Sequence, residues 1–405
     1  MSFQTGLSGL NASSKSLDVI GNNIANANTI GMKSSRTEFS DLVASSLGNG
    51  GTGGIAAGIG VAVGTVSQQF TQGNINITGN NLDVAINGGG FFQLTRNDGT
   101  LAYTRDGQFK LDKDGNLVSN TGANVMGYAT DVLGVPTSIT PIKMTVPSGA
   151  PIAASATTAI TAEFNLDARA LVAATAVPPT PRTAYGTALT AFDSQGAEVP
   201  VNLYFTRVAS TATDNWDVYD VPVGGAALFQ VQFDAAGKLV APAVSPTLTI
   251  PTASPVTPSI TATLDVSKVT QFGTAFNVSN LTQDGYTAGE LTGLTISPKG
   301  TITTRYSNGQ TQARGQLALA DFRNVQGLLP VGGSEYLETS ASGQPLLGNA
   351  GVGKFGEMRS GAVEESNVDL TAELVNMMTA QRNYQANAQT IKTQDQVLST
   401  LVNLR

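Results

Sequence analysis

The sequence predicts a mixed, mainly β protein, in which nested β domains are flanked by N- and C-terminal α-helices that pair as a coiled coil in an assembly. Three observations support this fold class. Apolar residues recur at alternating spacings of four and three at both ends, short strand-like runs lie between them, and the middle of the chain is rich in proline. These patterns follow one another in a roughly symmetric order, which indicates that one domain is inserted into another.

The first helix is predicted within residues 1–30 by a single apolar stripe. The stripe consists of Phe3, Leu7, Leu10, Leu17 and Ile24, with Ser14 and Gly21 at its two intermediate positions. The pattern ends in a stretch rich in Gly and Asn, residues that tolerate left-handed conformations and commonly end helices. One apolar stripe on one helix needs another element to cover it.

Residues 31–70 and 355–365 are predicted to be extended, glycine-rich connecting segments. Glycine is most frequent over residues 48–64, a run compatible with a flexible linker or with backbone that packs closely against copies of itself. The run lacks the Lys-Ser/Thr ending of a phosphate-binding loop, which excludes that third interpretation.

Residues 71–146 and 284–354 are expected to form a β core domain. Strand-like runs occupy residues 82–86, 91–94, 101–105, 108–111 and 117–119, and they resume over residues 291–306 and 316–323. Turn signals at residues 97–99 and 112–116 separate the early runs, which predicts an antiparallel meander.

Residues 147–283 are predicted to form an inserted outer β domain, either a sandwich or a barrel. Most of the chain's 17 prolines fall in this segment, together with many Thr, Ala and Val and few Lys or Arg. This shift in composition sets the domain boundaries.

The second helix is predicted within residues 366–405 and has the longer heptad pattern. Its seam consists of Leu370, Leu374, Met377, Gln381, Tyr384, Ala388, Ile391, Asp395, Leu398 and Val402. Gln381 and Asp395 weaken such a seam but can fix its register and partner. Ser366 and Asp369 are expected to form a capping box at the start of the helix. A long bundle helix inside one domain remains compatible with the same periodicity.

Composition excludes most enzyme chemistry. The chain has no His and no Cys, so it cannot form Ser-His-Asp or Cys-His nucleophilic sites, His or Cys zinc sites, or redox dithiols. Charged residues make up 13% of the chain against roughly 25% in an average protein, and the net charge is -7. An acidic chain without a cationic cluster is not expected to bind nucleic acid. The sequence therefore predicts a protein that is not an enzyme and has no cofactor or metal.

Three short motifs resemble ligand sites but lack the context that such sites require. The glycine pattern over residues 351–356 matches a dinucleotide fingerprint, without the parallel strand and following helix. Asp112, Asp114 and Gly115 match the start of a calcium loop, but Ala123 occupies the position of its bidentate acid. Glu364 and Glu365 form an acidic pair that we expect on a solvated surface or at a helix start.

Neither a secretory signal peptide nor a membrane span is expected. The first residues lack a basic region followed by a continuous apolar run, and no stretch approaches 18 consecutive apolar residues. If the protein leaves the cell, another export route must carry it.

Both ends and the β core resemble one protein family, that of the bacterial flagellar rod and hook subunits. The segments that resemble its signatures cover residues 17–26, 366–370, 373–377 and 381–387, with residues 82–86, 90–92 and 103–109 in the core. The signature positions are Leu17, Asp18, Gly21, Asn22, Asn23, Ala25, Asn26, Asn367, Val368 and Asp369. Several motifs in the family's order, over roughly half of the chain, make the resemblance specific.

The resemblance implies a homo-oligomer, a hollow helical tube outside the cell in the basal body and hook of the flagellum. It also implies export by the flagellar type III apparatus, terminal helices that line the tube, and no membrane insertion. Implied partners are the distal rod protein, the hook cap and the hook–filament junction protein. The inserted domain over residues 147–283 favours the hook, a flexible joint that transmits torque from rod to filament. The glycine-rich residues 48–58 instead favour a distal rod subunit, which is the alternative.

Overall fold

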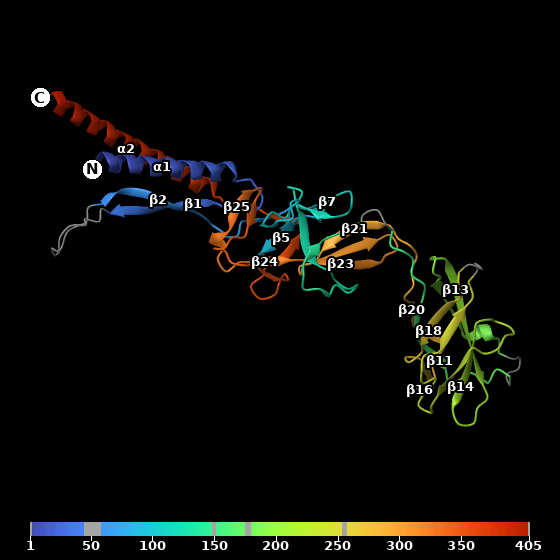
Figure 1. Ribbon diagram of the computed structural model, residues 1–405. Coiled ribbons are helices and arrows are strands. Elements are labelled where there is room, and N and C mark those ends of the chain that lie inside the picture. Colours follow the sequence, from blue (N-terminus) through green and yellow to red (C-terminus); the bar gives the residue numbers. More distant parts are fainter. Residues whose placement is uncertain (1, 44–57, 148–150, 175–179, 253–256, 404–405) are drawn as a thin grey trace. The chain divides into compact units, whose positions relative to one another are not determined.

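The computed structural model describes residues 2–43, 58–147, 151–174, 180–252 and 257–403 (Figure 1). The chain divides into two compact units. The first comprises Met1–Gly149, Gly293–Arg305 and Thr311–Arg405, and the second comprises Ala150–Thr292 and Tyr306–Gln310. The fold is mainly β with one helix at each end, as the sequence predicts.

The two helices and a β-hairpin form one end of the first unit. Helix α1 spans Ser2–Ala25 and helix α2 spans Leu370–Asn403. Strand β1, Ser35–Val43, pairs antiparallel with β2, Gly58–Gln68, in a register that runs from Ser35 opposite Gln68 to Val43 opposite Gly58. Residues 31–70 were expected to be a connecting segment, so the hairpin is a difference from the prediction. Its paired strands satisfy backbone groups that a solvated linker would leave to water. Residues 44–57 of the glycine-rich run lie outside the described residues.

The β core of the first unit is built around one large sheet with the strand order β21-β22-β23-β9-β5-β6-β26-β25. These strands span Leu291–Ile296, Thr301–Tyr306, Thr311–Leu317, Asn124–Tyr128, Phe91–Thr95, Leu101–Thr104, Glu335–Leu337 and Leu329–Gly332. The same sheet includes β7 (Lys110–Leu111), β8 (Leu117–Val118), β10 (Ile142–Lys143), β24 (Leu319–Asp321) and β27 (Leu346–Gly348). A short 3-10 helix, η2, covers Val325–Gly327.

Two further strand pairs fasten the C-terminal segment to the core. Strand β28 (Glu357–Ser360) pairs antiparallel with β4 (Val84–Asn87), and β29 (Ala362–Glu364) pairs antiparallel with β3 (Ile75–Ile77). These pairs lead directly to α2. The start of α2 is therefore fixed to the β core.

The turns behave as the sequence predicts. Asp98 accepts a hydrogen bond from the Thr100 backbone N–H between β5 and β6. Asp112 accepts from the N–H groups of Asp114 and Asn116 between β7 and β8. The Asp112 side chain therefore shapes a hairpin turn, as Asp commonly does.

The second unit is a sandwich of two sheets. One has the order β17-β18-β11-β19 with β20 also paired to β11, and the other has the order β12-β13-β14-β15-β16. The strands span Ala159–Asp167, Gly186–Phe192, Glu198–Val208, Asp214–Tyr219, Phe229–Phe233, Leu239–Ala241, Thr247–Ile250, Ile260–Asp265, Thr270–Phe272 and Asn277–Gln283, from β11 to β20, and the 3-10 helix η1 spans Arg182–Tyr185. Buried residues of both sheets, including Phe164, Phe205 and Trp216, share one core. Their alternation along each strand produces that inward face.

Candidate assembly site

Helices α1 and α2 pack against each other in opposite directions. Gly6 faces Ile391 and Gly9 faces Asn387, so the contacts advance along α1 while they retreat along α2. A Cβ atom on Gly6 would lie 3.1 Å from Ile391 Cγ1, and one on Gly9 would lie 2.9 Å from Asn387 Nδ2. The two glycines therefore permit a close approach of the helices.

The faces in contact coincide only in part with the stripes that the sequence marks: Met377, Ala388 and Ile391 belong to both, while other contact residues lie one position away. On α1 the buried residues are Gly6, Ala12, Val19, Ile20 and Asn23. On α2 the less exposed residues are Glu373, Met377, Ala380, Asn387, Ala388, Ile391 and Gln394. A shift of one residue rotates a helix by about 100°. Small residues such as Gly6 and Ala380 thus share the contact within the chain with larger apolar ones such as Ile391.

Most of the predicted seam is consequently open to solvent. Phe3, Leu7, Leu370, Leu374, Tyr384 and Leu398 are between 37% and 56% exposed. Gln381 and Asp395 are exposed as well, whereas Leu10, Leu17, Ile24, Met377, Ala388 and Ile391 are half-buried. Val402 lies in α2, but its side chain is outside the described residues. Helix α2 also extends beyond the N-terminal end of α1 (Figure 1), which leaves its last turns uncovered by α1.

The hairpin adds a third surface beside the helices. Gly60 approaches α1 so closely that a Cβ atom there would lie 2.3 Å from Ser8 Oγ, and its φ is +144°. Phe39 and Val61 of the hairpin line a cavity of about 320 Å³ with residues of both helices. A neighbouring cavity of about 430 Å³ shares Ser16, Ala380 and Asn383 with it. A groove therefore runs between α1, α2 and the hairpin.

The start of α2 differs from the predicted capping box. Asp369 Oδ1 accepts hydrogen bonds from the N–H groups of Thr371 at 2.9 Å and Ala372 at 3.1 Å, so Asp369 is the N-cap. Ser366 Oγ accepts instead from the Val368 N–H, before the helix. The prediction of a Ser366 cap was wrong because the helix begins at Leu370, too far along the chain for Ser366 to reach its first N–H groups.

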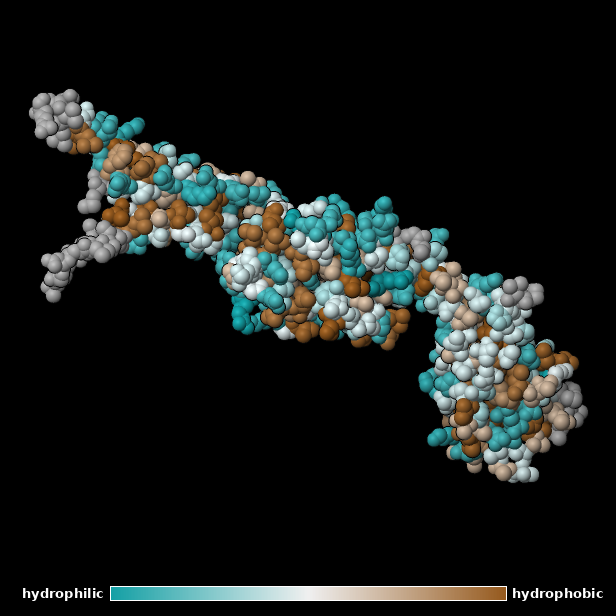
Figure 2. Space-filling model, viewed as in Figure 1, coloured by the Kyte–Doolittle hydropathy of each residue, from teal (hydrophilic) through white to brown (hydrophobic). Residues whose placement is uncertain are grey.

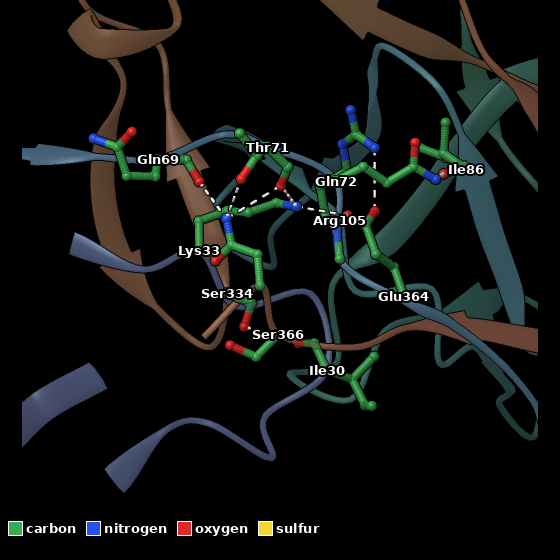
Figure 3. Close-up of polar contacts among 12 residues, drawn as sticks. Ile30, Lys33, Gln69, Thr71, Gln72, Ile86, Arg105, Ser334, Glu364 and Ser366 are labelled. Atoms are coloured by element: carbon green, nitrogen blue, oxygen red, sulfur yellow. Dashed lines mark hydrogen bonds and ion pairs between the residues drawn. The ribbon is translucent and has the colours of Figure 1, made fainter. Parts of the chain in front are cut away.

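A buried charged cluster lies where the N-terminal segment, the core and the C-terminal segment meet (Figure 3). Glu364 Oε1 lies 2.5 Å from Lys33 Nζ, and Glu364 Oε2 lies 3.1 Å from Arg105 Nη1. The three side chains are at most 7% exposed. The expectation of a solvated Glu364 was wrong, because its two cationic partners come from distant parts of the chain. Glu365, the other member of the acidic pair, is only half-buried.

Backbone groups complete the surroundings of this cluster. The Gly73 N–H donates to Glu364 Oε1 at 2.9 Å, and the Gly31 N–H donates to the Glu364 carbonyl at 2.8 Å. Lys33 Nζ also donates to the Thr71 carbonyl at 2.8 Å. Burial lowers the pKa of Lys33 and that of Arg105, while the Glu364 carboxylate opposes both shifts.

Two signature asparagines form hydrogen bonds between the segments that meet near this cluster. Asn367 Oδ1 accepts from the Ser34 N–H at 2.7 Å, while Asn367 Nδ2 donates to the carbonyls of Gln69 and Thr71. Asn23 makes two hydrogen bonds with the Ser35 backbone, as acceptor at 2.9 Å and as donor at 2.7 Å. An amide side chain can donate and accept at once, which explains asparagine at both positions.

The other signature residues have more varied surroundings. Leu17, Gly21, Asn26 and Val368 are half-buried, whereas Asp18, Asn22, Ala25 and Asp369 are exposed. A Cβ atom on Gly21 would meet nothing within 4 Å, so packing inside this chain does not require glycine there.

The described residues offer neither a metal site nor a helical membrane span. Among them, no group of three or more Asp or Glu side chains could hold a metal ion. Neither described helix is long and apolar enough to cross a membrane.

Comparison with family models identifies the class of protein. The model "Flagella basal body rod protein" matches residues 3–33, and "Flagellar basal body rod FlgEFG protein C-terminal" matches residues 359–404. Between them, "Flagellar hook protein FlgE/F/G D1 domain" matches residues 85–162 and "Flagellar basal body protein FlaE D2 domain" matches residues 165–286. Helical ends with β domains nested between them thus define a rod or hook type of flagellar subunit.

Similar proteins narrow this class. The chain is 40% identical to a flagellar hook protein FlgE of Escherichia coli (strain K12) and 41% identical to one of Salmonella typhimurium, with full coverage of both chains in each case. A crystal structure of Helicobacter pylori flagellar hook protein FlgE2 has the same fold, with a TM-score of 0.55 at 15% identity over 70% of this chain and 99% of that chain. The chain belongs to the flagellar hook protein family and is a structural subunit of the hook. The alternative of a distal rod subunit is not favoured.

Proposed function

We propose that copies of this chain contact one another through the apolar stripes of α1 and α2, which form the inner layer of the hook tube. One observation carries the proposal: large apolar side chains recur at heptad spacing on both helices, yet the packing of α1 on α2 leaves about half of them exposed. Figure 2 shows apolar residues open to solvent on the helices and the hairpin. Burying one such side chain contributes roughly 1.5–3 kcal/mol, so several of them can drive association.

Each helix has one face in contact within the chain and an apolar stripe that is partly exposed, which supports this proposal. The face with Gly6 and Gly9 is used within the chain, while the stripe with Leu7 and Leu374 remains for neighbours. If the stripe on α1 of one copy meets the stripe on α2 of the next, the two surfaces in contact are different. Copies can then add to one another head to tail. Such heterologous contacts generate open helical assemblies.

The β domains are proposed to form the outer layers of the tube and to accommodate its bending. Residues 71–146 and 284–354 would form the middle layer, and residues 147–283 the outer one. The chain has few charged residues, 13% in all, so few fixed ion pairs would resist sliding between neighbours. A tube of this kind would act as the universal joint that transmits torque from rod to filament.

Export and partners follow from membership of the family. We infer export by the flagellar type III apparatus and a final location outside the cell. We also infer contacts with the distal rod protein, the hook cap and the hook–filament junction protein. We further infer that the chain is not an enzyme, since its sequence has no His or Cys and its relatives are hook proteins.

A pair of adjacent residues tests the role of the stripe. Leu374 lies on the stripe and Val375 beside it, and both are 51% exposed. We expect Leu374→Gln to raise the concentration needed for polymerisation by roughly tenfold, because about 1.5 kcal/mol of apolar burial is lost at each contact. The measurement is sedimentation of tubes, checked by electron microscopy.

Val375→Gln is the matched control and should polymerise nearly as the unmodified chain does. Equal effects of the two substitutions would show that the stripe has no special role. Curved tubes formed equally well by both variants would lead to the same conclusion.

A further inference from the structure

We propose that the buried cluster of Lys33, Arg105 and Glu364 makes docking of the N-terminal segment depend on prior docking of the C-terminal segment. The three residues come from separate parts of the chain: Lys33 lies between α1 and β1, Arg105 follows β6, and Glu364 ends β29. Glu364 is 331 residues from Lys33 and 259 from Arg105. Figure 3 shows the cluster at the point where these segments meet.

The charges in the cluster are unequal. Both cations are paired with the Glu364 carboxylate, Asp321 acts at longer range on Arg105, and the Lys33 side chain is 1% exposed. Glu364 favours the charged form of Lys33, whereas burial and the Arg105 charge both disfavour it. If Glu364 were absent, the Lys33 ammonium would be buried beside a second cation, with the Thr71 carbonyl as an uncharged acceptor. An unpaired buried charge strongly destabilises a folded state.

The dependence is not symmetric between the two ends. Without Lys33, Glu364 would still have the Arg105 guanidinium and the Gly73 N–H as partners. Strand pairs β28·β4 and β29·β3 would also remain, because neither involves the N-terminal segment. The C-terminal segment can therefore dock on the core by itself. The N-terminal segment also has a core contact of its own, since Ser334 Oγ donates to the Ile30 carbonyl at 3.1 Å, but its buried Lys33 ammonium depends on Glu364 for an anionic partner.

Backbone contacts point in the same direction. The Gly31 N–H donates to the Glu364 carbonyl, and the Ser34 N–H donates to Asn367 Oδ1. Both acceptors belong to the C-terminal segment. Residues 31–34 thus rest in part on residues 364–367, and they gain these contacts only after the C-terminal segment is in place.

The consequence is an order of docking within one chain. Helix α1, with its exposed Phe3 and Leu7, is brought to its position only when α2 is already anchored. A subunit would then not present a fixed α1 stripe without its α2 partner, which limits association of incompletely folded copies. This inference concerns a single chain and does not rest on the contacts proposed between copies.

The test uses hydrogen exchange of the full-length monomer, read at the amides of Gly31 and Ser34. Glu364→Gln should accelerate exchange at both amides by at least roughly 100-fold, because it leaves the buried Lys33 ammonium beside Arg105 without an anionic partner. Lys33→Met should leave exchange in residues 357–367 within about threefold of the unmodified chain, since Glu364 keeps Arg105.

The double variant distinguishes charge balance from simple loss of contacts. Adding Lys33→Met to Glu364→Gln removes the surplus cation, so exchange at Gly31 should slow by roughly tenfold relative to Glu364→Gln alone. Glu365→Gln, which removes a neighbouring carboxylate without an ion pair among the described residues, is the matched control and should change exchange little.

Three results would overturn the proposal. The first is a double variant that exchanges faster than Glu364→Gln alone, which is the expectation for two lost contacts without charge coupling. The second is an equal effect of Glu365→Gln. The third is an absence of protection at Gly31 and Ser34 in the unmodified monomer.

Discussion

The helical end of the first unit and the inserted sandwich bury apolar residues in different ways. In the sandwich, inward-facing residues of two sheets complete a core, and Trp216, Phe205 and Phe233 are almost fully buried. At the helical end, the contact between α1 and α2 covers only part of the apolar residues, and large side chains such as Phe3 and Leu374 remain exposed. A complete core supports a fold by itself, whereas an uncovered stripe requires a partner. The same chain thus combines a sandwich with a closed core and a helical end with uncovered apolar residues, which we propose as the surface for assembly.

The largest expected effect follows from breaking the sandwich core. Phe205→Ala should lower the free energy of unfolding of the second unit by about 3–5 kcal/mol, because it removes a ring packed 4.6 Å from that of Phe164. Trp216, the single tryptophan, lies in this unit, so its fluorescence during urea unfolding reports on this unit. Phe272→Ala, at a ring that is 51% exposed, is the control and should cost far less. If Phe205→Ala and Phe272→Ala lowered the free energy of unfolding equally, burial in the core would not explain the stability of the unit.

Alkaline pH should lower the stability of the first unit through Tyr336, a residue that the second unit does not contain. Burial raises the pKa of Tyr336 in the first unit to about 12, against its ordinary value of 10.0. The folded state therefore keeps this proton where the unfolded state loses it, so stability is present below pH 10 and is lost as pH rises toward 12. The loss amounts to roughly 2 kcal/mol at pH 12.

Calorimetry at pH 9 and pH 11.5 checks this prediction. Tyr336→Phe should reduce the dependence of the first unit's unfolding temperature on pH, while the fluorescence transition of the second unit should not respond to the substitution. A pH dependence unchanged by Tyr336→Phe would contradict the assignment to Tyr336.

A smaller effect is expected at the junction that anchors α1 and α2. Asn367→Ala removes the acceptor of the Ser34 N–H and the donor to Gln69 and Thr71, at a cost of about 1–2 kcal/mol. Cleavage by trypsin after Lys33 should then be roughly tenfold faster. Asn376→Ala, on an exposed position of α2, serves as the control. If both variants were cleaved at the same rate, Asn367 would not hold the N-terminal segment.

The smallest expected effect concerns the helix cap. Asp369→Ala should destabilise the first turn of α2 by about 1 kcal/mol, because the N–H groups of Thr371 and Ala372 lose their acceptor. Hydrogen exchange of these two amides measures the change, and Asp369→Asn should preserve most of the protection. Faster exchange in Asp369→Asn equal to that in Asp369→Ala would argue for a charge effect in place of a cap.

Much of the fold could be predicted from local patterns in the sequence. Heptad spacing located both helices, and turn residues such as Asp98 and Asp112 located hairpins, because these signals act over a few residues. The hairpin of β1 and β2 was missed, since glycine-rich composition concealed the strand pattern of Phe39, Val61 and Val63. The alternation of apolar residues in β2 was the signal that could have revealed it.

The candidate site was predicted in part. The sequence identified the apolar stripes of α1 and α2, but it could not show that the two helices meet through faces that coincide only in part with these stripes. That choice depends on how closely two backbones approach, which Gly6 and Gly9 permit and which only the packed pair reveals. Nothing in the sequence distinguished Glu364 from Glu365, and both were expected on a solvated surface or at a helix start.

The sequence by itself determined the helical ends, the mainly β interior, the inserted domain and the absence of His and Cys chemistry. These features follow from composition and short-range periodicity, which do not depend on where distant segments lie. Only the tertiary structure decided which helix faces are covered and that Lys33, Arg105 and Glu364 share one buried site. Those features depend on contacts across 259 and 331 residues, and local pattern contains no information about such distances.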